Sequence, residues 1–346
     1  MMSQCAENGQ TGTFRVFCYN VFGLPKLISG VDRGVKWDTT FNQRSIGRYL
    51  NGEPYDVVAV QEDFGYHRLL AAEMTKYKYR TQPHGGIPSG DGTNIFTFEK
   101  KMYNEEHIPW NTLYGIVTDG ADRFSQKGLT YACIEIADGV YVDFYNIHTD
   151  ACDDEGSVKA RADNFRQLKE LISNRKIDRP VIVTGDFNET MSDDFAGMYH
   201  FLVNGCDLKD AWTELCNGGD YEDFTSYEDK YGYDTEDKLG VWDSIERFLY
   251  KSGGGVEITC DSFDFYDVKN ERGESCSDHK AARTTFTYKV TDKTKIKTVD
   301  LFETRPNYAR EYKRRAEKLF GAVKIAVDNR KEINGYIKEK VFKRNK

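Results

Sequence analysis

Several features that would assign a protein to a class are missing from this sequence of 346 residues. No run of apolar residues approaches the length of about 20 that a transmembrane helix requires, so an integral membrane protein is not expected. No Cys-x-x-Cys pair and no cluster of cysteine with histidine indicates a zinc site. The eight cysteines are scattered through a long chain and need no disulfide pairing.

The sequence also has no internal repeat, no low-complexity segment and no apolar stretch of a secretory signal in its first twelve residues. The chain is therefore expected to be cytoplasmic as given, or secreted if a signal was removed before the numbering begins.

Positive charge is scarce outside the C-terminal segment. Residues 291–346 contain 17 Lys and Arg against 8 Asp and Glu, a net charge of +9, whereas residues 1–290 contain 31 against 48, a net of −17. Proteins bind long nucleic acids largely through cationic side chains that displace counterions. The acidic body therefore disfavours a nuclease.

Short apolar runs rich in Val, Ile, Tyr and Phe recur through residues 14–290 and predict β-strands. Helical periodicity is clearest in Val158–Ser173, and helices are also expected on both sides of Asp56–Val60. Two successive runs lie too close for a helical crossover, which predicts mixed sheets in an α/β (α+β) fold. The runs are Phe14–Tyr19, Asp56–Val60, Asn94–Phe98, Leu129–Ile136, Val140–Ile147, Pro180–Thr184, Ser244–Tyr250 and Ala281–Tyr288.

The character of the chain changes near residue 290. Apolar residues then recur every three or four positions from Pro306 toward Phe342, which predicts a basic helical extension. We therefore expect a main domain over residues 13–289 and a C-terminal extension over residues 290–346. The cations of the extension either meet an anionic membrane surface or form its solvated face while its apolar face packs on the body or on a partner chain.

Polar side chains that can bind a metal or a phosphate follow several of the predicted strands. Each alone is more often a turn residue or a satisfied structural group, but their recurrence at strand ends indicates one shared site. Carboxylates, amides and imidazoles without a thiolate suit Mg²⁺ better than zinc, and Mn²⁺ or Ca²⁺ accepts the same donors. The candidates are Asn20, Glu62, His148, Asp186, Asn188, Asp278 and His279.

The order of these residues also resembles that of the endonuclease/exonuclease/phosphatase, or DNase I-like, superfamily. The resemblance covers residues 14 to about 288. Its motifs are, in order, Asn20, Gln61-Glu62, His148, Gly185-Asp186-Phe187-Asn188, Asp243 and Ser277-Asp278-His279. Three segments further resemble neutral sphingomyelinases: Tyr19–Pro25, the Lys-Gly block in Phe124–Tyr131, and Asn146–Ala151.

The resemblance implies a four-layer α/β/β/α sandwich of two mixed sheets, with the active site where the strands end. Glu62 would ligate the catalytic Mg²⁺ with Asn20 beside it, and Asp278 would support the metal or a neighbouring hydrogen bond. Asp186 would orient and deprotonate the attacking water, and Asn188 would hold that water or a phosphoryl oxygen.

The same resemblance implies roles for the cationic groups. His279 would act on the phosphate as an acid/base or as an imidazolium, oriented by Asp243. His148 would donate to a non-bridging oxygen, and Lys127 would lie near the phosphate. Phosphoryl transfer asks a protein mainly for such positioning and charge stabilisation.

Three segments depart from the sphingomyelinase pattern, one of them the basic C-terminal extension, which has no counterpart there. Residues 252–274 stand where secreted bacterial sphingomyelinases carry an aromatic hairpin that touches membranes, but here Phe263, Phe265 and Tyr266 alternate with aspartates. The acidic segment Asp207–Leu239 is either a lid over the site or a solvated loop.

The function that the resemblance implies is a Mg²⁺-dependent phosphodiester hydrolase of a phospholipid headgroup, similar to sphingomyelin phosphodiesterase. The alternatives on the same site are a phosphatase of inositol phosphates or other small phosphates, and a nuclease. A non-catalytic scaffold is disfavoured because Glu62, Asp186 and His279 are all present. The oligomeric state is not indicated.

Overall fold

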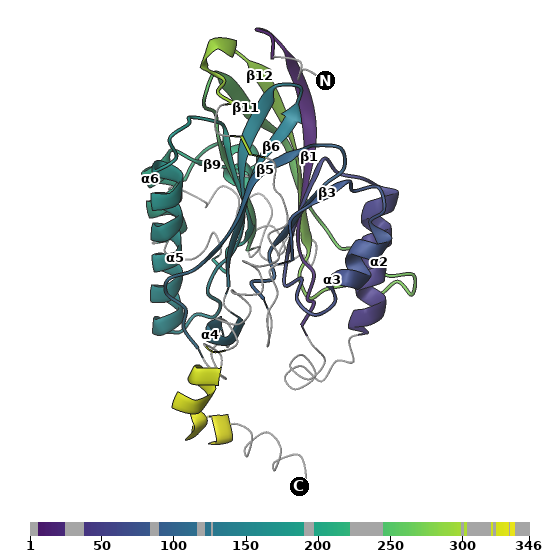
Figure 1. Ribbon diagram of the computed structural model, residues 1–346, viewed down its shortest axis with the longest axis vertical. Coiled ribbons are helices and arrows are strands. Elements are labelled where there is room, and N and C mark those ends of the chain that lie inside the picture. Colours follow the sequence, from purple (N-terminus) through teal and green to yellow (C-terminus); the bar gives the residue numbers. More distant parts are fainter. Residues whose placement is uncertain are drawn as a thin grey trace.

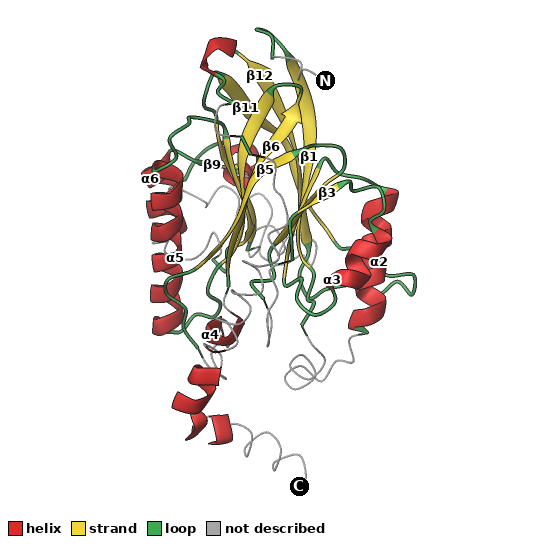
Figure 2. Ribbon diagram, viewed as in Figure 1, coloured by secondary structure: helices red, strands yellow, loops and turns green. Residues whose placement is uncertain are grey.

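Two six-stranded sheets lie face to face, with helices on both outer faces (Figure 1). The computed structural model describes residues 6–24, 38–83, 90–115, 122–125, 127–189, 197–221, 245–298, 301–302, 320, 323–331 and 333–335. Figure 2 shows the helices in red on either side of the yellow strands. The four-layer sandwich expected from the sequence is confirmed.

The first sheet has the strand order β11-β12-β1-β2-β4-β3. Its only parallel pair is β1 with β2, and the other neighbours among its strands run antiparallel. Its strands are β1 (Thr11–Asn20), β2 (Val57–Gln61), β3 (Tyr79–Arg80), β4 (Asn94–Thr97), β11 (Val256–Tyr266) and β12 (Ala281–Val290).

The second sheet repeats this arrangement in the order β5-β6-β7-β8-β10-β9, with β7 and β8 as its parallel pair. The predicted antiparallel pairing of residues 129–136 with 140–147 is confirmed by the register of β6 and β7. The strands are β5 (Met102–Pro109), β6 (Gly128–Ala137), β7 (Val140–His148), β8 (Val181–Asp186), β9 (Lys209–Asp210) and β10 (Glu246–Lys251).

Helices α2 (Thr39–Gly52) and α3 (His67–Glu73) cover the first sheet, and α5 (Glu155–Ser173) covers the second. Asp154 caps α5 by accepting hydrogen bonds from the backbone N–H groups of Gly156 and Ser157. The remaining helical turns are α4 (Asp122–Ser125), α6 (Asn204–Cys206), α7 (Ala211–Cys216), a π-helical turn over Tyr199–Val203 and a 3₁₀ turn over Lys293–Lys295.

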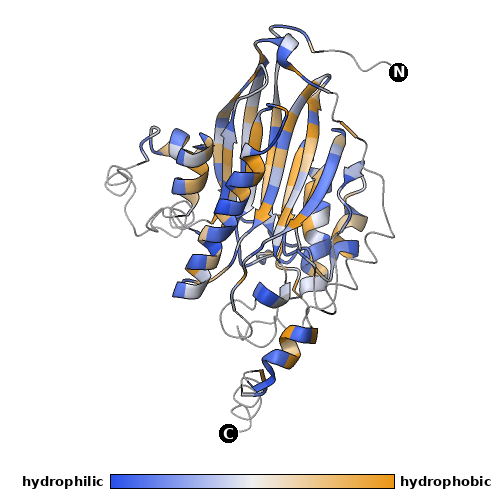
Figure 3. Ribbon diagram, turned by 60° about the vertical axis from the view of Figure 1, so that its left-hand side comes forward, coloured by the Kyte–Doolittle hydropathy of each residue, from blue (hydrophilic) through white to orange (hydrophobic). Residues whose placement is uncertain are grey.

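Strand β1 shows how the residue alternation builds the layers. Phe14, Val16 and Cys18 face the second sheet and belong to the core between the sheets. Phe17 and Tyr19 point the other way and pack among the residues of α2 and α3. In Figure 3 the strands are largely hydrophobic, while α5, which comes forward in that view, turns a mostly hydrophilic surface outward. Both faces of the central strands β1, β2, β7 and β8 are therefore buried.

Two segments that depart from the sphingomyelinase pattern contain regular structure. Residues 256–266 form β11, where Phe263 and Phe265 are partly buried and pack against the core. In the segment expected to be a lid or a loop, residues 207–221 include β9 and α7, and Trp212 is buried there. A lid at 222–239 lies outside the residues that the structure describes.

The C-terminal extension is helical over the described parts of 323–335, where hydrogen bonds from Asn329 N to Ile325 O and from Ile333 N to Asn329 O mark helical turns. The rest of the predicted helix lies outside the described residues. No helix in the described part of the chain is both long and apolar enough to cross a bilayer.

A cluster of buried polar side chains around His107 of β5 links the two sheets. Nδ1 of His107 lies 2.9 Å from the Asp91 carboxylate, and Nε2 lies 3.4 Å from Glu105. Thr130 of β6 donates a hydrogen bond of 2.8 Å to the backbone oxygen of Thr93, just before β4. Burial opposes the charge on His107, but the two carboxylates outweigh burial and raise the pKa of His107 to about 9.

This raised pKa predicts a pH-dependent contribution to stability. His107 binds its proton more tightly in the folded state than in the unfolded state, where its pKa has the usual value of about 6.5. Its contribution to the free energy of unfolding is therefore fully present below pH 6.5 and is lost as the pH rises through 9. We expect His107→Gln to lower the free energy of unfolding by about 2–3 kcal/mol more at pH 6 than at pH 9.5. Urea denaturation at the two pH values measures this, with the exposed His200→Gln as control. An equal loss at both values would contradict it.

Candidate active site

The ends of four strands and one loop meet at one end of the sandwich. Asn20 is the last residue of β1, His148 the last of β7 and Asp186 the last of β8. Glu62 directly follows β2, with a left-handed backbone (φ 54°). His279 stands in the loop before β12. Side chains from both sheets therefore converge where the sequence predicts a shared site.

Asn20 lies at the centre of this cluster and contacts three of its members. Its Nδ2 lies 2.9 Å from the Asp186 carboxylate, 3.2 Å from the Glu62 carboxylate and 3.3 Å from Nε2 of His279. Its Oδ1 accepts a hydrogen bond from the backbone N–H of Phe22, which fixes the orientation of the amide. One neutral amide thus joins a carboxylate from each sheet.

Gly185 allows β8 to approach β7 closely enough for this arrangement. Its φ is 147°, and a Cβ at this position would lie 2.0 Å from the backbone oxygen of Ile147. Past the strand, Asn188 donates its backbone N–H to Asp186 Oδ1 at 3.0 Å and its side-chain amide to the Thr149 oxygen at 3.1 Å. Asn188 therefore orients the Asp186 carboxylate through the backbone.

The two histidines have opposite electrostatic environments. Burial opposes charge on His279, but Glu246, whose Oε1 lies 2.6 Å from Nδ1, raises the pKa of His279 to about 10. Burial, together with Lys127, lowers the pKa of His148 well below its usual value. At neutral pH His279 is an imidazolium and His148 a neutral imidazole, 3.4 Å from Asp186.

Asp186 lies between these histidines. Burial alone would raise its pKa, but the His279 imidazolium, Lys127 and the hydrogen bond from Asn20 lower it, so the carboxylate is ionised. Lys127 is buried, and its ammonium pairs with Asp122 at 2.9 Å. The charges of Asp186 and Glu62 also help to raise the pKa of Lys127 against burial, which places a fixed positive charge beside the two carboxylates.

Glu62 has the features of a metal ligand. Its Oε2 is buried and has no hydrogen-bond partner among the described residues. Burial raises the pKa of Glu62 to about 7, against the effect of His279 and Lys127. A buried carboxylate oxygen without a donor is costly, and a divalent cation would satisfy it. The residues present therefore fit a hard cation at Glu62, with Asn20 beside it.

A second group of possible ligands fits a different role. Asp186, Glu246 and His279 offer ligand atoms within 4.8 Å of one another. However, the close pairing of Glu246 with His279 keeps the imidazole protonated, and a protonated nitrogen cannot bind a metal. This group suits charge stabilisation and proton transfer better than metal binding.

The structure brings together most of the residues predicted from the sequence. Asp278 lies at the edge of the site, with Oδ1 3.9 Å from Nε2 of His279. Asp243, predicted to orient His279, lies outside the described residues, and Glu246 is the carboxylate found on Nδ1 of that histidine. Sequence reasoning missed Glu246, although its place as a carboxylate at the start of β10, opposite Asp186, was a usable signal.

Comparison with known proteins gives a consistent result. Residues 19–232 match the Endonuclease/Exonuclease/phosphatase family. Sphingomyelinases of Mycobacterium bovis and Mycobacterium tuberculosis are 32% identical over 288 residues, which cover 80% of this chain and 53% of each relative. The chain thus spans about half the length of the curated relatives it matches.

Solved structures show the same fold at low sequence identity. A humanized TDP2 of D. rerio superimposes with a TM-score of 0.57 at 18% identity, covering 79% of this chain and 98% of that one. Sphingomyelinase C of Streptomyces griseocarneus gives 0.54 at 19% identity, with 79% and 99% coverage. A mutant beta toxin of Staphylococcus aureus with bound magnesium ions gives 0.55 at 16% identity, again with 79% and 99% coverage.

The role of Glu246 can be measured without turnover. Because its carboxylate supplies the largest favourable interaction of the His279 imidazolium, we expect Glu246→Gln to lower the pKa of His279 from about 10 by more than about one unit. A pH titration of the histidine side chains by NMR measures the shift. The exposed His200 serves as internal control, and an unchanged His279 titration would contradict the assignment.

Proposed function

The chain belongs to the endonuclease/exonuclease/phosphatase family, and we propose that it is a phosphodiesterase that hydrolyses a phospholipid headgroup, as a sphingomyelinase does. The observation that carries the proposal is the cluster of Glu62, Asn20, Asp186 and His279 at the common end of the two sheets. In this cluster an ionised carboxylate, a protonated imidazole and a candidate metal ligand surround one amide.

Asp186 has the properties of the group that orients and deprotonates the attacking water. Its carboxylate is ionised, and Asn20 and the backbone of Asn188 fix its orientation. A base acts on water only when it is held in hydrogen-bond reach. The proton of the water passes to Asp186 as the new bond to phosphorus forms.

His279 and Lys127 supply positive charge where the phosphoryl oxygens gain negative charge. The Glu246 carboxylate keeps His279 protonated, so this imidazolium can donate to a phosphoryl oxygen or protonate the departing one. His148 is neutral, and its buried Nδ1 has no hydrogen-bond partner among the described residues. Hydrogen-bond donors that are already aligned before the reaction usually make the largest single contribution to stabilising the transition state.

Glu62 would hold a divalent cation, with Asn20 orienting its carboxylate, and Mg²⁺ is the natural choice given oxygen donors without thiolate. When bound, this cation would neutralise charge on the phosphate and lower the pKa of a coordinated water. Asp278 lies close enough to His279 to act at the edge of the same centre.

Two observations support a lipid headgroup over a nucleic acid. The relatives with 32% identity are named sphingomyelinases, and they match 80% of this chain. Residues 1–290 carry a net charge of −17, which suits a cationic choline group and opposes a long polyanion. Because the chain spans about half of those relatives, substrate and activity are our proposal for this chain.

We further propose peripheral membrane contact through the C-terminal extension. Phe320, Val323 and Val327 are 74%, 51% and 61% exposed, so these side chains do not pack on the body. The extension from residue 291 carries a net charge of +9. Exposed apolar side chains among basic residues are typical of helices that bind the surface of anionic membranes.

Hydrolysis assays with Mg²⁺ test the proposal on sphingomyelin, phosphatidylcholine, inositol phosphates and plasmid DNA. We expect the wild-type protein to release phosphocholine from sphingomyelin. Asp186→Ala and His279→Ala should each lower the rate by at least about 10²-fold, because they remove the base and the charge-stabilising imidazolium.

The matched controls are Asp153→Ala and His200→Ala, which remove an exposed group of the same type from a residue that is not part of the cluster. Both should retain wild-type rates. Nicking of DNA without lipid turnover would overturn the proposed substrate, and turnover that survives Asp186→Ala would overturn the proposed site.

A further inference from the structure

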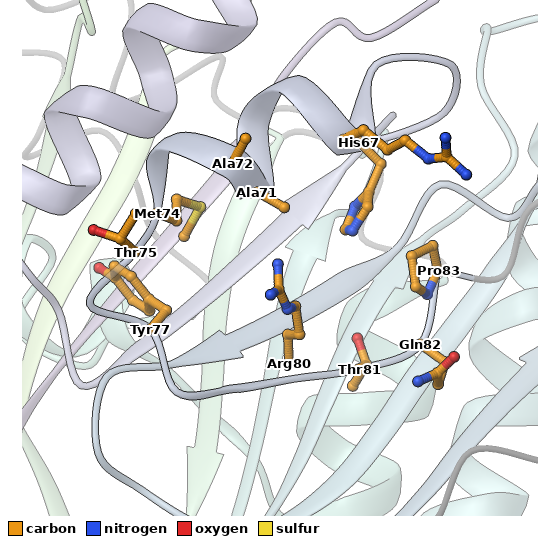
Figure 4. A pocket seen from close by; sticks show the side chains of 11 residues that line it. His67, Ala71, Ala72, Met74, Thr75, Tyr77, Arg80, Thr81, Gln82 and Pro83 are labelled. Carbon is orange, nitrogen blue, oxygen red and sulfur yellow. The ribbon is translucent and has the colours of Figure 1, made fainter.

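A cavity of about 590 Å³ lies between α3 and β3, at the edge of the first sheet (Figure 4). None of its lining residues belongs to the catalytic cluster. The volume lies within the range of small-molecule sites.

The floor of this cavity is apolar. Ala71, Met74 and Tyr77 line it and are buried. The Tyr77 hydroxyl is already used, because it accepts a hydrogen bond of 3.0 Å from the backbone N–H of Tyr55 and lies 3.4 Å from the Leu50 oxygen. Tyr77 therefore offers the cavity the apolar body of its ring.

Two exposed arginines, Arg68 and Arg80, line the cavity. Arg68 and Arg80 form no ion pair with any acidic group in the described part of the chain, whereas the exposed Arg48 and Arg15 each do. Both arginines lie in a body of net charge −17 and are not paired with any acidic group among the residues that the structure describes. Guanidinium groups recognise phosphate and carboxylate oxygens through paired hydrogen bonds.

His67 adds an oriented imidazole. Its Nδ1 lies 2.5 Å from the buried Asp63 carboxylate, and its ring stacks on Phe96 with centroids 5.8 Å apart. Figure 4 shows the imidazole pointing into the cavity near Arg80. With Nδ1 held by the carboxylate, Nε2 is the nitrogen left for a ligand.

We propose that this cavity is a second binding site, distinct from the catalytic centre, for a phosphomonoester with a small organic group. Arg68, Arg80 and His67 bind the phosphate, and Ala71, Met74 and Tyr77 contact the organic group. Two guanidinium groups and an imidazole match a doubly charged phosphate better than a single carboxylate. The ligand is either a free phosphomonoester or the phosphate headgroup of a membrane lipid.

The test is a binding measurement on the full chain in EDTA, without turnover, so its outcome is independent of the proposed hydrolase activity. Glycerol 3-phosphate is titrated by calorimetry, and phosphatidylcholine vesicles with and without phosphatidic acid are used for sedimentation. The pocket variant is Arg68→Gln with Arg80→Gln. The matched control is Lys76→Gln with Lys78→Gln, which removes the same charge from exposed residues that do not line the cavity.

We expect the pocket variant to bind at least about tenfold more weakly than the control, which is about 1.4 kcal/mol. Since the catalytic centre can also accept phosphate, only the difference between the two double variants is scored. A loss with glycerol 3-phosphate assigns a free phosphomonoester, and a loss confined to phosphatidic acid vesicles assigns a lipid headgroup. Equal binding by the two double variants in both arms would overturn the proposal.

Discussion

The hydrogen bonds of the Asn20 side-chain amide are the contacts on which the active-site geometry depends. They bring together Glu62 from the end of the first sheet and Asp186 from the end of the second, and Nε2 of His279 from the loop before β12 lies 3.3 Å from the same amide nitrogen. Two buried carboxylates repel each other unless donors and cations lie between them. The neutral amide supplies the donor, and Lys127 and His279 supply the charge. The sandwich is thus the scaffold that holds this amide at the junction of both sheets.

The protonation states of the two active-site histidines follow from their burial and from the charges of their different neighbours. His279 faces a carboxylate at 2.6 Å and stays protonated, whereas His148 is buried beside a lysine and stays neutral. In enzymes, two groups of the same type whose pKa values are shifted in opposite directions often act as the acid and the base of the reaction. The opposite shifts at His148 and His279 therefore argue against a purely structural role for the cluster.

Much of the fold could be predicted from the sequence because buried strands have continuous apolar runs. All eight predicted runs correspond to strands of the sandwich. The strands that were missed are β3, β5, β9 and β11, which are short, polar or have an exposed face. Their pairing depends on the neighbouring strand more than on their own composition.

The residues of the candidate site could be predicted from the sequence about as well as the strands could. Carboxylates and amides that directly follow apolar runs were identified, since strand ends of a packed sheet lie close together. Glu246 was missed because it is the first residue of a strand rather than one that follows a strand. The cavity of Arg68 and Arg80 could not be predicted, since residues of α3 and β3 form it only through tertiary packing.

The most direct test of the central claim is calorimetric titration of Mg²⁺ into the wild-type protein and Glu62→Gln at pH 6 and pH 8. If Glu62 is the principal ligand, the wild type binds Mg²⁺ more tightly at pH 8, because a carboxyl group with a pKa of about 7 must lose its proton first. Glu62→Gln should bind at least about tenfold more weakly at pH 8, while the exposed control Glu99→Gln should match the wild type. Wild-type affinity in Glu62→Gln would contradict the account.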